Sequence, residues 1–249
     1  MLRFIIPAYN EEKNIGVLVE NTRKFVQREK HEYQIIVVND GSTDKTVQIL
    51  DELKKKAPIV ILDQGSNKGV GEAFRTGFKY AAEVAEEGDI IISKEADNTS
   101  DLAILGGMIN KITEGYDLVL ASCYMPGGEV TNTSISRRIL SVGANFLLKM
   151  TTPLKGVHTF SSFYRAYRAN LIKEAYGIYG EKLIEEKGFS CMVELLIKLA
   201  NLDIKITEVP MTLKGDMRKG RSKMKILDTT ISYIKLIFKN TLMGGRRKL

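Results

Sequence analysis

Two carboxylates directly after an apolar run are the clearest chemical signal in the sequence. Glu95 and Asp97 follow the run Ile90–Ser93 and stand two positions apart. On an extended backbone, side chains two positions apart point the same way. Paired carboxylate oxygens suit Mg²⁺ or Mn²⁺, whose coordination would be completed by diphosphate oxygens and water. A solvated acidic turn, in which Asp97 or Thr99 caps the next helix, is the alternative interpretation.

The turn after the first apolar run, Leu2–Ile6, carries an aromatic ring and a carboxylate. Tyr9 offers a flat surface for stacking, and Glu11 could accept hydrogen bonds from a base or a ribose. Alternatively, Glu11 and Glu12 only favour the positive end of the following helix.

Asp40 stands at the carboxyl end of a second apolar run, Ile35–Val38. A carboxylate there is suited to bind a nucleobase N–H. The bland alternative is a capped turn, but Ser42 and Asp44 are sufficient to cap the next helix. Since capping does not require Asp40, we favour a functional role for this residue.

A third turn, Asn67-Lys68-Gly69-Val70-Gly71, is rich in glycine and leads into a helix. Glycines permit close approach of the backbone to an anion, and the helix N-terminus adds a favourable field. The turn does not match a Walker A loop and lacks the third glycine of a dinucleotide-binding fingerprint. By itself it does not identify a ligand.

Alternating strands and helices must position these four turns. Apolar runs rich in β-branched residues predict strands at Leu2–Ile6, Ile35–Val38, Ile59–Leu62, Ile90–Ser93 and Leu118–Ser122. Helical spacing between them predicts helices at Asn14–Lys30, Thr46–Lys56, Gly71–Glu87 and Leu102–Glu114. This alternation indicates an α/β fold with a mostly parallel central sheet flanked by helices. Ligands of such sheets bind outside the carboxyl ends of the strands, where the four turns lie.

The second half of the chain shows a different pattern. Ser134–Met150 and Phe189–Ala200 have helical spacing, and Ile204–Leu213 resembles a strand. A final amphipathic stretch places Leu227, Ile231, Ile234 and Phe238 on one helical face.

Charge and composition limit the possible partners and the compartment. The net charge is +7, but residues 214–249 hold eleven Lys or Arg against two Asp, a net of +9. Such a basic tail indicates an anionic surface or ligand. No apolar run approaches the roughly 18 residues of a spanning helix, and Cys123 and Cys191 form no disulfide framework. We therefore expect a cytoplasmic protein without a signal peptide.

Several ordered motifs carry a family resemblance over nearly the whole chain to about residue 225. They are FIIPAYNEEKNI at 4–15, VVNDGSTDKT at 37–46, NKGVGEAFRTGF at 67–78, EADNT at 95–99, SRRILSVGANFLL at 136–148, FYRAYR at 163–168 and EVPMTLKGDMRKGRSKM at 208–224. With these motifs the sequence resembles family 2 glycosyltransferases of the GT-A fold, in the dolichyl-phosphate mannosyltransferase-like branch. The resemblance implies a GT-A domain over 1–225, with a nucleotide-sugar half at 1–125 and an acceptor half at 126–225. The basic amphipathic helix and tail at 226–249 would follow it.

The resemblance also implies roles for individual residues. The nucleotide sugar would contact Pro7, Ala8, Tyr9, Glu11, Asp40, Lys68, Ala96, Asp97, Arg218 and Lys223. A Mg²⁺ or Mn²⁺ cofactor would be held by Glu95, Asp97 and Thr99, and the acceptor phosphate by Arg137, Ser141, Arg165 and Ser222. Asp97 and Arg137 are the expected catalytic residues, and Glu194 is the best candidate for a base. Where the family usually carries Asp and Arg, this chain has Glu95 and Cys123; Thr159 lies in an altered acceptor segment.

The implied reaction is an inverting, metal-dependent transfer of mannose or glucose from a GDP- or UDP-sugar to a polyprenyl (dolichyl) phosphate. A phosphate acceptor is already an anion and needs no base, whereas a glycan hydroxyl would need one such as Glu194. Transfer to a glycan hydroxyl and nucleotide-sugar binding with little catalysis are the two alternatives.

The basic C-terminal helix would bind the cytoplasmic face of a membrane peripherally. Packing on the core or a homodimer contact is the other use for this helix. No recognition motif accompanies the basic tail, so we expect no nucleic-acid partner.

Overall fold

A computed structural model of the protein describes residues 1–133, 143, 145, 148–149, 154, 156–220, 223, 229–233 and 235–236. Its main feature is a sheet of seven strands in the order β3-β2-β1-β4-β7-β5-β8. The strands are β1 (Leu2–Ala8), β2 (Tyr33–Asn39), β3 (Ile59–Asp63), β4 (Ile90–Ser93), β5 (Leu118–Ser122), β7 (Arg165–Arg168) and β8 (Ile206–Pro210). Only β7 runs antiparallel to its neighbours, so the expected mostly parallel sheet is confirmed.

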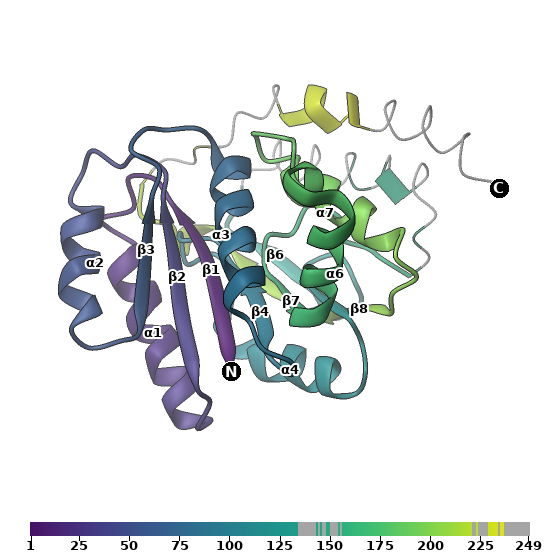
Figure 1. Ribbon diagram of the computed structural model, residues 1–249, viewed down its shortest axis with the longest axis horizontal. Coiled ribbons are helices and arrows are strands. Elements are labelled where there is room, and N and C mark those ends of the chain that lie inside the picture. Colours follow the sequence, from purple (N-terminus) through teal and green to yellow (C-terminus); the bar gives the residue numbers. More distant parts are fainter. Residues whose placement is uncertain are drawn as a thin grey trace.

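Helices cover both faces of this sheet (Figure 1). They are α1 (Ile15–Arg28), α2 (Thr46–Lys54), α3 (Val70–Val84), α4 (Leu105–Thr113), α6 (Ala169–Tyr179) and α7 (Cys191–Ala200), with short 3₁₀ turns η1 (Leu102–Ile104), η2 (Gly180–Leu183) and η3 (Gly215–Met217). One core packs α1, α2 and α4 against the sheet, and the other packs α3, α6 and α7. Successive residues of β1 enter opposite cores, with Phe4 and Ile6 in the first and Ile5 in the second. Because both faces are buried, the central strands are continuously apolar.

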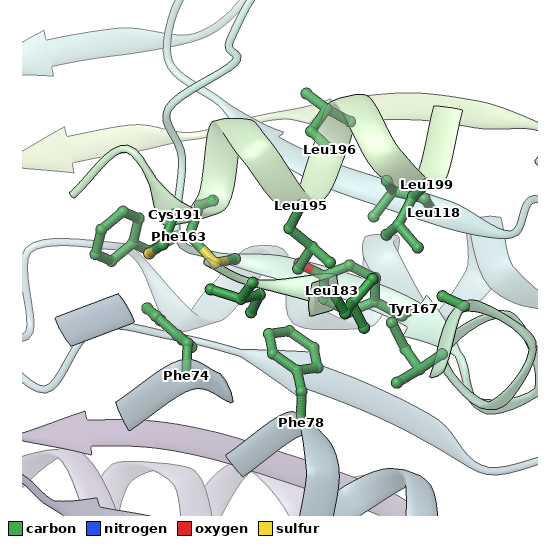
Figure 2. Packing of buried hydrophobic residues seen from close by; sticks show 14 of the residues in the cluster. Phe74, Phe78, Leu118, Phe163, Tyr167, Leu183, Cys191, Leu195, Leu196 and Leu199 are labelled. Carbon is green, nitrogen blue, oxygen red and sulfur yellow. The ribbon is translucent and has the colours of Figure 1, made fainter. Parts of the chain in front are cut away.

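Aromatic side chains organise the core under α3, α6 and α7 (Figure 2). Phe74 meets Phe163 edge to face with ring centroids 5.2 Å apart, and Phe78 meets Tyr167 in the same way at 5.2 Å. Such edge-to-face pairs add about 0.5–1.5 kcal/mol beyond the burial of their area. These contacts hold α3 against β7 and the residues just before it.

The single strand expected at Ile204–Leu213 is wrong, because the segment divides between two sheets. β8 ends at Pro210, and β9 (Thr212–Lys214) pairs instead with β6 (Glu129–Thr131) in a separate two-stranded sheet. The break falls at Met211, whose N–H donates to the Ser122 carbonyl at 2.9 Å. β9 thereby leaves the main sheet and leads into the basic segment that follows.

The C-terminal segment is helical at residues 229–233 and 235–236. Tyr233 and Leu236 are buried in the core of α3, α6 and α7, whereas Ile231 is 51% exposed. Ile231 belongs to the expected apolar face, and its exposure shows that other residues of this segment, Tyr233 and Leu236, pack on the protein. The other three members of the expected face lie outside the described residues: Leu227, Ile234 and Phe238.

Bilayer crossing requires a long, apolar helix, and none of the helices in the described parts of the chain meets both conditions.

Candidate active site

The carboxyl ends of β1, β2, β4 and β5 open onto a cleft with a volume of about 1020 Å³. Nearly all residues expected to bind the nucleotide sugar or a metal line it: Pro7, Ala8, Tyr9, Glu11, Asp40, Glu95, Ala96, Asp97, Thr99, Arg218 and Lys223. Lys68 is the exception among them, since its exposed side chain lies in a separate small depression beside Glu72 and Arg75. The sheet therefore gathers turns that are far apart in the chain at one edge, as the parallel topology requires.

A basic loop, defined here as residues 214–220 together with Lys223, lies over this cleft. The Arg218 guanidinium binds the Asp97 carboxylate through Nε at 2.8 Å and through Nη2. Lys223 Nζ lies 2.5 Å from Glu11 Oε1 and 3.0 Å from the Asn10 carbonyl, and it also contacts the Tyr9 carbonyl. Two cations of the loop thus meet carboxylates of the site itself.

Asp97 and Glu95 have different surroundings within the cleft. Asp97 is 8% exposed, and its Oδ1 accepts hydrogen bonds from the Thr99 amide at 3.0 Å and the Thr99 hydroxyl at 2.7 Å. Glu95 Oε2 accepts from the Ser100 hydroxyl at 3.0 Å. Burial, followed by the negative charge of Asp97, raises the pKa of Glu95. Thr99 therefore orients Asp97, and the two carboxylates form a concentrated anionic patch.

This pair fits a divalent cation in donor type and in charge. Both side chains offer carboxylate oxygens, which Mg²⁺ and Mn²⁺ prefer, and Asp97 already binds a positively charged group. No group of three or more His, Cys, Asp or Glu side chains in the described part of the chain could hold a metal ion alone. A metal here would take one or two carboxylates from the protein and its remaining ligands from substrate and water.

The Asp40 carboxylate accepts hydrogen bonds from backbone amides of the glycine turn. Asp40 is 3% exposed, and its carboxylate accepts from the Lys68 amide at 2.6 Å and the Gly69 amide at 3.1 Å. Burial is the main cause of a raised pKa for Asp40. The Gly71 amide donates to the Lys187 carbonyl at 2.9 Å. The amides expected to approach an anion are thus already bonded within the protein.

Close packing against a neighbouring backbone segment requires glycine at two positions of this turn. Gly69 has a φ of +99°, and a Cβ there would lie 2.6 Å from the Lys187 carbonyl oxygen. A Cβ on Gly71 would lie 1.8 Å from the Glu186 carbonyl oxygen, which is far inside contact distance. The close approach expected of these glycines is therefore to the backbone before α7.

Glu194 is misplaced for the catalytic base expected of it. Its side chain is buried in the first turn of α7 and does not line the cleft. One oxygen accepts from the Glu185 and Glu186 amides at 2.8 Å each, and the other binds Lys198 at 2.7 Å. Glu194 holds the chain before α7 in place and is not positioned to act as a base in the cleft.

Arg165 is likewise misplaced for a ligand of the acceptor phosphate. It is fully buried in β7, with Nε donating to the Ser162 carbonyl and Nη2 to the Phe160 carbonyl at 2.7 Å each. Its charge braces the turn before β7 and does not reach the cleft. The other expected phosphate ligands, Arg137, Ser141 and Ser222, lie outside the described residues.

Glu208 anchors the wall of the cleft that contains Thr159. Its carboxylate accepts from the His158 amide at 2.9 Å and the Thr159 amide at 2.8 Å, and lies 2.8 Å from His158 Nδ1. Cys123 lines the same side, where burial raises its pKa to about 11. This wall is held firmly, but the cation absent at position 123 is not replaced by His158, which is engaged with Glu208.

Two residues near the cleft escaped prediction. Lys94 is 1% exposed, with Nζ 2.6 Å from the Ser100 carbonyl and 4.3 Å from the centre of the Tyr164 ring. Burial lowers the pKa of Lys94 to about 8. Asn14 is 3% exposed and binds the basic loop. A lysine directly after an apolar strand was a usable signal, whereas nothing local marked Asn14.

Comparison with known proteins places the chain in a family. Residues 4–175 match the family model described as glycosyl transferase family 2. A dolichol-phosphate mannosyltransferase of Pyrococcus furiosus is 30% identical over 94% of this chain, which spans 62% of that protein's length. A polyprenol monophosphomannose synthase of Mycolicibacterium smegmatis is 29% identical over 88% of this chain and 79% of that protein. An undecaprenyl-phosphate mannosyltransferase of Micrococcus luteus is 28% identical over 88% of this chain and 86% of that protein.

Solved structures share the fold. A glucosyl-3-phosphoglycerate synthase from Mycobacterium tuberculosis, crystallised with Mn²⁺, uridine diphosphate and phosphoglyceric acid, superposes with a TM-score of 0.69. The superposition covers 96% of this chain and 78% of the synthase chain, with 16% sequence identity. At that identity the likeness supports the GT-A-like fold alone.

Proposed function

The chain belongs to glycosyl transferase family 2, and from this premise we propose that it moves a hexose from a nucleotide sugar to a polyprenyl phosphate. The donor is a GDP- or UDP-sugar carrying mannose or glucose, and the transfer inverts the anomeric centre. Mannose has the stronger support, since the three relatives are named for mannosyl transfer or phosphomannose synthesis.

The observation that carries the proposal is the pairing of the basic loop with the site carboxylates. Arg218 binds Asp97 and Lys223 binds Glu11, all at the carboxyl edge of the parallel strands. Transfer from a nucleotide sugar develops negative charge on the departing diphosphate. Cations fixed at that position stabilise this charge most in the transition state.

The chain's own residues account for donor binding in this proposal. Tyr9, Glu11 and Asp40 line the cleft and would contact the nucleoside, and Arg218 lines it too and would contact the diphosphate. Glu95 and Asp97 would hold Mg²⁺ or Mn²⁺, which neutralises diphosphate charge when bound. Arg218 and Lys223 then exclude water and orient the donor from above.

The acceptor follows from the requirement for a base. A hydroxyl acceptor must lose a proton to a carboxylate, whereas a phosphate monoester attacks as an anion. Glu194, the carboxylate best placed by the sequence, is buried away from the cleft. Its loss as a base favours the phosphate acceptor. We further propose that the C-terminal segment brings the enzyme to the membrane that contains such a lipid.

Product analysis tests the proposal. The full chain is incubated with GDP-mannose or UDP-glucose, Mn²⁺ and a polyprenyl phosphate in detergent micelles. We expect a β-linked hexosyl phosphoryl lipid, no product with EDTA and recovery on adding Mn²⁺. Transfer to a water-soluble glycan in place of the lipid would refute the acceptor assignment. Nucleotide binding without any transfer would instead indicate a nucleotide-sugar-binding protein.

A further inference from the structure

Asn14 occupies the N-cap position of α1 but does not cap the helix. Its φ and ψ are −118° and −39°, and its side chain makes no hydrogen bond to the first turn. Asparagine at this position ordinarily accepts from a backbone amide of that turn. The buried amide group of Asn14 is used elsewhere.

The side-chain amide of Asn14 bonds both the backbone N–H and the backbone carbonyl of Lys219, which lies 205 positions away in the chain. Oδ1 accepts from the Lys219 amide at 3.0 Å, and Nδ2 donates to the Lys219 carbonyl at 3.0 Å. This two-bond pairing fixes the backbone of one loop residue in both position and direction. Since Lys219 directly follows Arg218, the pairing acts next to the guanidinium that meets Asp97.

The remaining hydrogen of Nδ2 connects Asn14 to the nucleoside end of the cleft. Nδ2 lies 2.6 Å from Glu11 Oε2, while the other oxygen of Glu11 faces Lys223. The Asn14 carbonyl accepts from Asn98 Nδ2 at 3.0 Å, next to Asp97 in the chain. Asn14 thus links three segments: its side-chain amide bonds the Glu11 turn and the basic loop, and its backbone carbonyl bonds the carboxylate turn.

We infer that Asn14 is a positioning residue that docks the basic loop on the donor cleft. It holds Arg218 and Lys223 where they meet the diphosphate, and it sets the orientation of Glu11. The inference rests on the proposed function only for the identity of the ligand. The docking itself is a property of the free protein.

Three variants test this role. Serine in Asn14→Ser can cap α1 but cannot span both Lys219 groups, and alanine in Asn14→Ala can do neither. Asn21→Ala is the matched control, because Asn21 is an exposed asparagine on the same helix. Amide hydrogen exchange over 214–220 is measured in the full chain, and GDP and UDP binding is measured with Mn²⁺ by calorimetry.

For both Asn14 variants we expect faster exchange over 214–220 and roughly tenfold weaker nucleotide binding, as for the loss of hydrogen bonds to a charged partner. In the transfer assay the donor KM should rise more than kcat falls, with the acceptor KM unchanged. Asn21→Ala should match the wild type throughout. Should Asn14→Ala fail to fold, Asn14→Ser decides the matter.

Wild-type exchange and nucleotide affinity in a folded Asn14→Ser protein would overturn the inference. Loss of thermal stability with unchanged loop exchange would also overturn it, since a capping role alone predicts that result. If the wild type binds nucleotide but transfers nothing to lipid, the proposed reaction fails and the exchange measurement still decides the role of Asn14.

Discussion

Single carboxylates in this protein are distinguished by what they bind. Asp97 faces a cation of the loop in the open cleft, whereas Glu194 is enclosed by two backbone amides and Lys198. Charge alone made both plausible catalytic groups. Only the partners separate a group that meets a ligand from one that fixes the chain.

Replacing Glu194 therefore tests structure against catalysis. In Glu194→Gln an amide NH₂ group replaces one carboxylate oxygen, and the ion pair with Lys198 is lost. We expect the free energy of unfolding to fall by about 1–3 kcal/mol, since hydrogen bonds to charged groups are involved. The kcat should stay within a factor of a few, as measured by product formation. The exposed Glu174 supplies the control Glu174→Gln. A loss of kcat of roughly a hundredfold at unchanged stability would restore Glu194 as a base.

Cys123 gives a pH-dependent prediction at the same scale. Burial raises its pKa to about 11 in the folded protein, against about 8.5 for an unfolded thiol. Alkylation requires the thiolate, so modification by iodoacetamide should be slow at pH 8 and rise about tenfold per pH unit toward 11. The raised pKa also means that stability is retained below about pH 8.5 and decreases as the pH approaches 11. Peptide mass spectrometry of native and denatured protein measures the rates. Equal rates in both states near pH 8 would contradict the burial.

At the scale of elements, the start of α3 depends on close backbone packing. Gly71→Ala would place a methyl group 1.8 Å from the Glu186 carbonyl oxygen, so the segment before α7 must move. We expect a loss of about 1–3 kcal/mol in the free energy of unfolding. Gly177→Ala on α6 is the control, because its Cβ would meet nothing within 4 Å. That change should stabilise the protein by roughly 0.5–1 kcal/mol. Denaturant titration compares the two, and equal effects would refute the packing argument.

The sequence predicted elements well where local pattern determines them. Ile90–Ser93 and Leu118–Ser122 match β4 and β5 at both ends, because buried parallel strands are continuous β-branched runs. β7 was missed, since it is four residues long and begins with a buried arginine whose partners are carbonyls. The split at Met211 was also missed, because only the distant β6 defines it.

The candidate site divides in the same way. Turns at strand ends could be placed by topology, so the residues expected to bind the donor, apart from Lys68, do lie at one edge. The functions of Asn14 and Glu194 depend on partners that local sequence does not reveal. For Asn14 the decisive contact is 205 residues away. For Glu194 it is the path of the chain before α7.

Over the whole molecule, part of the excess positive charge is already used inside the cleft. Arg218 and Lys223 pair there with Asp97 and Glu11, and Lys214 pairs with Asp101, neither of which lines the cleft. The basic segment therefore contributes less to a general positive field than its net charge of +9 suggests. In the proposed donor complex Arg218 and Lys223 would exchange their carboxylate partners for diphosphate.

The C-terminal helix contacts a residue that lines the cleft. Tyr233 is 9% exposed, and its hydroxyl bonds Ser161, which lines the cleft; burial raises the pKa of Tyr233 to about 12. One face of the helix thus supports the catalytic domain, while Ile231 on another face is 51% exposed. An exposed apolar side chain four positions before the exposed Lys235 suits the interface of an anionic membrane.

Separate variants should therefore divide the two roles of this helix. Tyr233→Ala should lower the free energy of unfolding by about 3 kcal/mol, since a large buried ring is removed. Ile231→Asp should leave stability within about 0.5 kcal/mol of the wild type, because the site is exposed. It should nevertheless weaken sedimentation with vesicles containing phosphatidylglycerol several-fold, by removing apolar contact and adding negative charge. Neutral phosphatidylcholine vesicles are the control for the electrostatic contribution. Unchanged vesicle binding in a stable Ile231→Asp protein would show that this helix supports the fold alone and that the enzyme reaches its lipid through another surface.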